Sequence, residues 1–231
     1  MQAEIVCELI HRPEYTYIKN RTTGNPMNPR KLSIIAGLSY LVIFFAAIFA
    51  NFLVLQSIFE EPLVTIQQNH MMVRFGILAF MITVVFDVVV AWALYELYRK
   101  DKLSGLSTLF RMMHAAIMAV AVFGLVAALD ATTGEEVLSY ANMFNTIWLI
   151  GLFFFGIHLL LLGKIIGRPV LIAVFLVIAG IMYMVDTGAH FLLSEYETYA
   201  SIFLALVAIP SILGEMSLAI WLLVKGGKGK E

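Results

Sequence analysis

Six long apolar stretches, separated by short polar connections, fill the chain from residue 33 to residue 224. Each stretch reaches or exceeds the ~20 residues that an α-helix needs to cross a bilayer. Helices are expected because lipid offers no partner to unpaired backbone groups, and the alternation typical of membrane β-barrels is missing. The sequence therefore predicts an all-α fold, an integral membrane bundle of six transmembrane helices at residues 33–58, 71–97, 105–129, 138–163, 169–192 and 198–224.

The basic residues are distributed unevenly over the connections. Of the 15 Lys and Arg residues, all but Arg74 and Arg111 lie before the first stretch, after the last, or in the second and fourth connections. The other connections carry the acids Glu60, Glu61, Asp130, Glu135, Glu136, Glu195 and Glu197. Because Lys and Arg are retained on the cytoplasmic side during insertion, we predict that both termini are cytoplasmic and that the chain lies in the cytoplasmic (plasma) membrane.

Residues 1–26 differ from the rest of the chain because they are polar and irregular. Met27 then opens the run Met-Asn-Pro-Arg-Lys directly before the first apolar stretch. We expect residues 1–26 to be a disordered extension or to precede the natural start at Met27. We expect residues 27–231 to form a single six-helix transmembrane domain, because short connections make neighbouring helices antiparallel hairpins.

Composition excludes several classes of partner and site. Charged residues make up 13% of the chain and the net charge is −1. No basic patch remains outside the clusters that flank the membrane, so the expected partner is the lipid bilayer and not a nucleic acid. Cys7 is the single cysteine, which excludes an internal disulfide and a cysteine-based metal cluster. No Walker loop, dinucleotide fingerprint, His-Glu-x-x-His motif or nucleophile elbow is present, so the sequence names no cofactor.

Five ionisable residues are predicted to lie at one depth in the cytoplasmic half of the membrane: Asp87, Arg111, His114, His158 and Glu215. Counting about 1.5 Å per residue from the helix ends places them roughly 10–18 Å deep. An ionised side chain at such a depth costs at least ~2.5–3.5 kcal/mol unless it is paired or faces a wet cavity. A buried acid–Arg pair accounts for Asp87 and Arg111 but leaves the other three unexplained. We therefore predict an inner polar cluster, and Pro210 is expected to kink the sixth span just before Glu215.

A smaller outer polar cluster is predicted from Arg74, Asp186 and His190. Asp186 and His190 are four residues apart and share one helix face. We expect an Arg74–Asp186 ion pair that fixes the helix register, with His190 as a partner of Asp186 and not a metal ligand.

Several of these residues also carry a family resemblance. The chain resembles the DUF4386 family over about residues 27–226. The resemblance is carried by the run from Met27 to Leu41, by Arg74-Phe75-Gly76-Ile77, by Phe154 to Gly163, and by Gly214-Glu215 with Ala219 to Leu223. The resemblance implies a prokaryotic multi-pass membrane protein and assigns no activity. The matching positions include Arg74, Asp87, Arg111, His158, Asp186 and Glu215, whereas His114 and His190 lie outside the clear part of the pattern.

Four functions remain open at this point. The favoured one is a membrane-embedded binding protein in which the inner cluster opens to the cytoplasm and takes an ion, a proton or a small polar ligand. The second is an intramembrane metal-dependent hydrolase, with His158, His114, Asp87 and Glu215 as the ligands available to Zn²⁺. The third is a b-type haem held by His114 and His158. The fourth is a structural or accessory membrane subunit whose polar clusters only specify packing.

Overall fold

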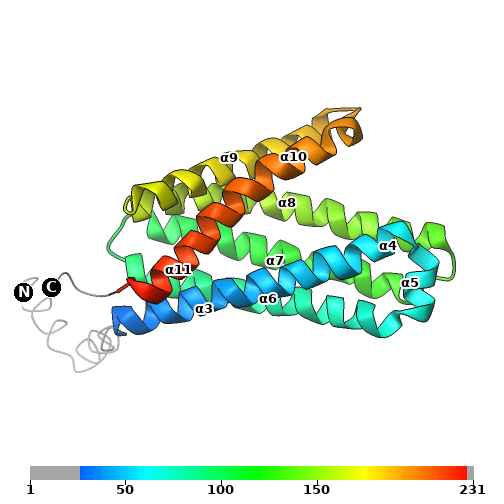
Figure 1. Ribbon diagram of the computed structural model, residues 1–231, viewed down its shortest axis with the longest axis horizontal. Coiled ribbons are helices and arrows are strands. Elements are labelled where there is room, and N and C mark those ends of the chain that lie inside the picture. Colours follow the sequence, from blue (N-terminus) through cyan, green and yellow to red (C-terminus); the bar gives the residue numbers. More distant parts are fainter. Residues whose placement is uncertain (1–26, 228–231) are drawn as a thin grey trace, which may run out of the picture.

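The computed structural model describes residues 27–227, and these residues are almost entirely helical, without a strand (Figure 1). Six helical segments are long and apolar enough to cross a membrane, at Pro29–Glu60, His70–Tyr98, Ser104–Ala128, Gly134–Ile166, Val170–Leu192 and Tyr196–Val224. The predicted all-α bundle with six spans is therefore confirmed. The expectations for residues 1–26, with Cys7, lie outside the described residues.

The first and last spans are each divided by a π-helical segment. The first consists of α3 (Pro29–Ile48), the π-helix η1 (Phe49–Leu55) and α4 (Gln56–Glu60), and the short α5 (Pro62–Gln68) follows it. The last consists of α10 (Tyr196–Ser211), η2 (Ile212–Met216) and α11 (Ser217–Val224). Pro210 lies inside α10, and its missing N–H removes a helical hydrogen bond next to η2. The expected irregularity before Glu215 is thus a π-helical turn that contains Glu215 itself.

The four middle spans are continuous helices: α6 (His70–Tyr98), α7 (Ser104–Ala128), α8 (Gly134–Ile166) and α9 (Val170–Leu192). The sequence starts α8 with a capping box, in which the Thr133 hydroxyl accepts from the Glu136 N–H at 3.2 Å and the Glu136 carboxylate accepts from the Thr133 N–H at 3.3 Å. Helix α3 packs against α6, α7 packs against α6 and α8, and α9 packs against the opposite side of α8 (Figure 1).

Helices α8 and α9 come close together at two glycines. A Cβ placed on Gly180 would lie 2.5 Å from the Gly156 carbonyl oxygen, and one on Gly156 would lie 2.6 Å from the Gly180 carbonyl oxygen. Small residues allow this approach because association of helices in lipid depends on close backbone packing.

The last span joins the bundle at one end and leaves it at the other. Helix α11 packs against α3, whereas α10 packs chiefly against α9 and diverges from α3 (Figure 1). The Arg30 guanidinium fixes the packed end, because it donates to the carbonyls of Leu222 at 2.9 Å, of Gly226 at 3.0 Å and of Leu223. These carbonyls belong to the end of α11, where a cation is favoured. Both ends of the described chain therefore lie at the same end of the bundle.

Two apolar cores fill the bundle, and buried polar residues separate them. The first core lies toward α4 and α5 and includes Val54, Phe80 and Phe144. The second lies toward the ends of the chain and includes Leu159 and Leu218. Along α6 the polar residues Thr83 and Asp87 fall between the two sets.

Candidate functional site

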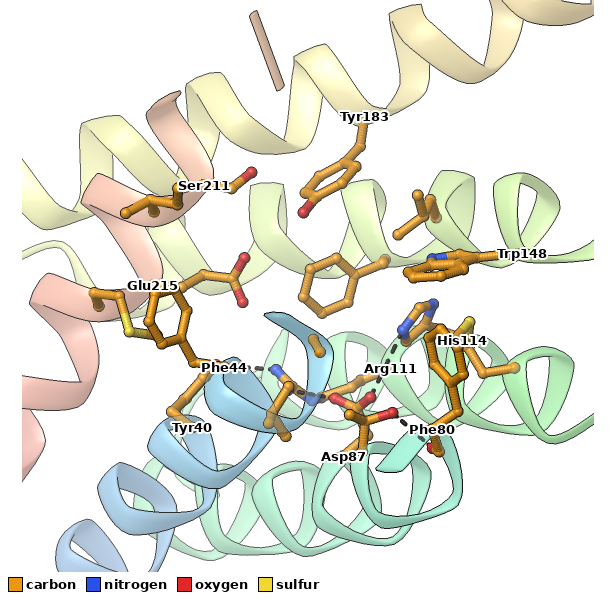
Figure 2. Close-up of a pocket in the computed structure, with 18 residues that line it drawn as sticks. Tyr40, Phe44, Phe80, Asp87, Arg111, His114, Trp148, Tyr183, Ser211 and Glu215 are labelled. Atoms are coloured by element: carbon orange, nitrogen blue, oxygen red, sulfur yellow. Dashed lines mark hydrogen bonds and ion pairs between the residues drawn. The ribbon is translucent and has the colours of Figure 1, made fainter. Parts of the chain in front are cut away.

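A cavity of about 200 Å³ occupies the space between the two apolar cores (Figure 2). Its walls come from α3, α6, α7, α8, α9 and the α10–η2 junction. The polar lining residues are Tyr40, Thr83, Asp87, Arg111, His114, Trp148, Tyr183, Ser211 and Glu215. Four of the five residues of the predicted inner cluster therefore line one cavity, and the fifth, His158, contacts Arg111 from behind it.

Arg111 connects four helices through its guanidinium group. Nη2 donates to Asp87 Oδ1 on α6 at 2.5 Å, and Nη1 donates to the Tyr40 hydroxyl on α3 at 2.9 Å and to His158 Nε2 on α8 at 3.2 Å. The guanidinium carbon also lies 4.9 Å from the centre of the Tyr40 ring, which is favourable for a cation. Arg111 and Asp87 are 1% and 5% exposed, so their charges are paired away from both lipid and water.

His158 has both ring nitrogens occupied. Arg111 can only donate, so Nε2 of His158 must accept, and the proton of the neutral ring lies on Nδ1. Nδ1 lies 2.9 Å from the Ser107 carbonyl oxygen and 2.9 Å from the Ser107 hydroxyl oxygen. Because Nδ1 is protonated, it cannot take a proton from the Ser107 hydroxyl. The Ser107–His158 contact is therefore a packing interaction between α7 and α8 and not a nucleophilic pair.

His114 lies at the cavity wall beside Asp87. Its Nε2 is 3.7 Å from Asp87 Oδ2, and its ring packs on Phe155 with 4.8 Å between ring centres. Its Nδ1 is buried without a hydrogen-bond partner within residues 27–227, as are Arg111 Nε and Trp148 Nε1. Arg111 Nε and Trp148 Nε1 are N–H donors, and buried donors normally have a partner, which water or a ligand in this cavity would supply.

Glu215 enters the cavity from the opposite side, on η2. Its carboxylate points into the cavity, and the phenol of Tyr183 points toward the same space from α9 (Figure 2). Within the described residues the Glu215 carboxylate makes no hydrogen bond or ion pair, whereas the Asp87 carboxylate is paired with Arg111. The cavity therefore has one acid that is paired inside the protein and one that is not.

The structure does not contain the ion pair expected in the outer polar cluster. Arg74 is exposed on α6 and forms no ion pair among the residues that the structure describes. Asp186 accepts a hydrogen bond from the Tyr196 hydroxyl at 2.6 Å, and His190 stacks edge-on against the Tyr196 ring with 4.7 Å between ring centres. The expected Arg74–Asp186 pair is wrong, because Arg74 is exposed on α6 and the Asp186 carboxylate is engaged by Tyr196 at the start of α10. Among the described residues His190 forms no ion pair with Asp186 and contacts Tyr196 instead.

The geometry also argues against the metal and haem interpretations. Within residues 27–227 no group of three or more His, Cys, Asp or Glu side chains is arranged to hold a metal ion. His158 could ligate a metal or a haem iron only by giving up Arg111 or Ser107, since each ring nitrogen already has a partner. The proposed ligand sets that include His158 are therefore not supported by this arrangement.

Three residues that hydrogen-bond to members of the two predicted clusters are not predicted from the sequence: Tyr40, Ser107 and Tyr196. Tyr40 lies in the first span at a depth similar to that of Arg111, so applying the depth argument to tyrosines would have found it. Tyr196 is the first residue of α10, where an interfacial tyrosine is unremarkable from sequence alone. Ser107 gives no such signal, because small polar residues are common at helix–helix contacts in membranes.

Comparisons with known proteins agree with the fold. The profile of the family described as "Domain of unknown function (DUF4386)" matches residues 35–226. An "Uncharacterized protein" of Archaeoglobus fulgidus is 31% identical over 163 residues, which cover 68% of this chain and 87% of that protein. No solved structure matches the chain. With six apolar helices and a family match over most of its length, the chain is a multi-pass membrane protein that belongs to the family Domain of unknown function (DUF4386).

Proposed function

We propose that this chain is a membrane-embedded binding protein whose cavity takes a small cation or a polar, positively charged ligand at Glu215. The observation that carries the proposal is the difference between the two acids of the cavity. Asp87 is neutralised by Arg111 at 2.5 Å, whereas Glu215 faces the cavity without a partner among the described residues. A carboxylate inside a membrane needs a counter-charge or a proton, and no residue that the structure describes forms an ion pair or a hydrogen bond with Glu215.

The Asp87–Arg111–His158 network has a different role in this proposal. Each of its members has a partner within the network, and its hydrogen bonds join α3, α6, α7 and α8. A network that is satisfied internally offers little to a ligand but does specify how helices pack. The structural role considered for the inner cluster is therefore assigned to this network, and the binding role to Glu215.

Binding is tested by ligand-dependent stability. Purified full-length protein in nanodiscs is unfolded thermally with Na⁺, K⁺, ammonium or tetramethylammonium, and a Glu215→Gln variant is measured in parallel. A ligand present at 100 times its Kd stabilises the folded state by about 2.7 kcal/mol. We expect at least one cation to raise the Tm of the parent and not that of the variant. The proposal fails if no cation distinguishes the two proteins.

The stability of the empty variant gives a second test. A carboxylate retained for binding costs stability when its ligand is absent, so Glu215→Gln is expected to be as stable as the parent or more stable. Collapse of the variant would instead assign Glu215 to packing.

We also infer that both termini face the cytoplasm and that the membrane is the plasma membrane. The basic connections support this, because Arg99 and Lys100 lie beside Met27 at the end of the bundle where the described chain begins. In a Cys7→Ser background, Glu135→Cys is expected to react with a membrane-impermeant maleimide in intact cells. Lys164→Cys is expected to react only after permeabilisation, and the reverse pattern would invert the topology.

A further inference from the structure

Lining residues on α3 and η2 are partly exposed, so the cavity opens toward the side of the bundle between these two elements. The partly exposed lining residues include Phe44 and Ala47 of α3 and Ile212 and Met216 of η2. Between these elements α10 diverges from α3 toward α9 (Figure 1). Phe44 lies halfway along the span Pro29–Glu60, and Ile212 lies just past the middle of the span Tyr196–Val224. The mouth is therefore close to the midplane of the membrane.

A mouth at this depth faces acyl chains and not water. The side chains beside it are apolar and exposed, with Phe45 66%, Ile209 60% and Ile212 50% accessible. A fully hydrated ion would have to shed its water in hydrocarbon to arrive there, whereas a molecule with an apolar chain can diffuse within the bilayer. The expectation that the cluster opens to the cytoplasm does not account for this side opening, and access from the lipid phase does.

The inner wall of the cavity selects the polar group of such a molecule. Phe44 and Tyr183 lie beside the space into which the Glu215 carboxylate points (Figure 2). The rings of Tyr40 and Phe155 also line the cavity, and they face the Arg111 guanidinium. Aromatic faces together with a carboxylate recognise ammonium groups, because the ring faces and the carboxylate are both negative. An anionic headgroup is disfavoured, since the one arginine of the cavity already has Asp87 as its counter-ion.

The size of the cavity limits the occupant. An engineered cavity of about 150 Å³ in a protein core holds one benzene molecule. The present cavity, at about 200 Å³, has room for an ammonium headgroup and the first few carbons of a chain, with the remaining chain in the mouth. A two-chain phospholipid headgroup with its glycerol is too large.

We propose that the ligand is a single-chain amphiphile with an ammonium headgroup, which reaches Glu215 laterally from the bilayer through the mouth between α3 and η2. This inference rests on the proposed binding function, because it names the chemical class of the ligand and its route. It assigns Glu215 to the headgroup and the aromatic rings to its methyl or methylene groups.

Trp148 provides a local reporter, because it lines the cavity. In a Trp92→Phe/Trp221→Phe background it is the only remaining tryptophan. Full-length protein in nanodiscs of neutral lipid is titrated with dodecyltrimethylammonium carrying a bromine near the headgroup, and quenching of Trp148 is recorded. Glu215→Gln in the same background is expected to raise the half-quenching concentration about ten- to hundredfold, the usual loss for a hydrogen bond or ion pair to a charged group. Its Tm confirms that the variant is folded.

Two matched probes separate the parts of the proposal. Brominated dodecanol and dodecyl sulfate carry the same chain without the positive charge, and equal quenching by either would overturn the headgroup assignment. Phe44→Leu removes one ring of the wall without removing the chain's apolar surroundings, and it is expected to weaken binding of the ammonium probe a few-fold while leaving the dodecanol signal unchanged.

The same titration separates failure of this inference from failure of the proposed function. If tetramethylammonium stabilises the parent in a Glu215-dependent way but the chain-bearing probe binds no tighter, the site exists and the amphiphile is the wrong class. If neither probe shows any dependence on Glu215, both the ligand class and the binding function are wrong.

Discussion

Replacing Arg111 with methionine should destabilise the bundle more than any other single substitution in the polar network. The guanidinium is 1% exposed and holds three partners on three other helices. Methionine keeps much of the volume but leaves the Asp87 carboxylate, 5% exposed, without a counter-charge. Breaking a buried ion pair from one side costs about 3–5 kcal/mol, and the hydroxyl of Tyr40 and the ring of His158 lose a donor as well.

The assay is reversible unfolding in mixed micelles, with the folded fraction followed as the SDS content rises. Arg74→Met is the matched control, because Arg74 is also a membrane-span arginine but is exposed and outside any ion pair among residues 27–227. It should change stability by less than about 0.5 kcal/mol, as surface substitutions usually do. The double variant Asp87→Asn/Arg111→Met should cost less than the sum of its single variants by up to about 3 kcal/mol, because the second change removes the orphaned charge. Equal costs for Arg111→Met and Arg74→Met, or strict additivity in the double variant, would refute the assignment of Arg111 as the centre of helix packing.

Three further predictions address helix contacts outside the Arg111 network. Gly180→Ala should lower the free energy of unfolding by about 1–3 kcal/mol in the same assay, because its Cβ would lie 2.5 Å from the Gly156 carbonyl oxygen on α8. Gly188→Ala has free space for its Cβ and should be neutral or slightly stabilising. Tyr196→Phe should lower the free energy of unfolding by about 1–3 kcal/mol, because it leaves the buried Asp186 carboxylate without its donor. Tyr199→Phe, at an exposed position, should leave the free energy of unfolding unchanged, and equal effects of the two variants would contradict this assignment. Arg30→Met should speed amide hydrogen exchange at the end of α11 by at least about tenfold, with unchanged exchange showing that the helix end does not depend on the guanidinium.

Depth in the membrane predicts which residues belong to the inner cluster but not which of them are partners. It placed Asp87, Arg111, His114, His158 and Glu215 at one level, and the structure brings four of them to one cavity and the fifth to Arg111. It failed where partner choice depends on which helix faces are opposed. The sequence offers His158 as a metal or haem ligand, yet its ring nitrogens are taken by Ser107 and Arg111 on α7.

The outer cluster is a second case in which depth in the membrane does not predict the partner of a charged residue. Arg74 and Asp186 share a depth, and opposite charges at one depth suggest a pair. Their helices, α6 and α9, lie on different sides of α8, so the two side chains do not meet. The partner of Asp186 is Tyr196, from the helix that follows it after a short turn. Depth is a one-dimensional coordinate, and it cannot distinguish a neighbouring helix from a distant one.

The amino-acid sequence by itself determined the spans, the helical class and the expected orientation, because hydrocarbon thickness and the retention of Lys and Arg act on each segment independently of the others. The tertiary structure decided which of the two carboxylates of the cavity is paired, where the cavity opens and how α10 departs from α3. Those features depend on helix rotation, on the close approach at Gly156 and Gly180 and on the π-helical turn around Glu215. They arise from contacts between segments far apart in the chain, so no single segment encodes them.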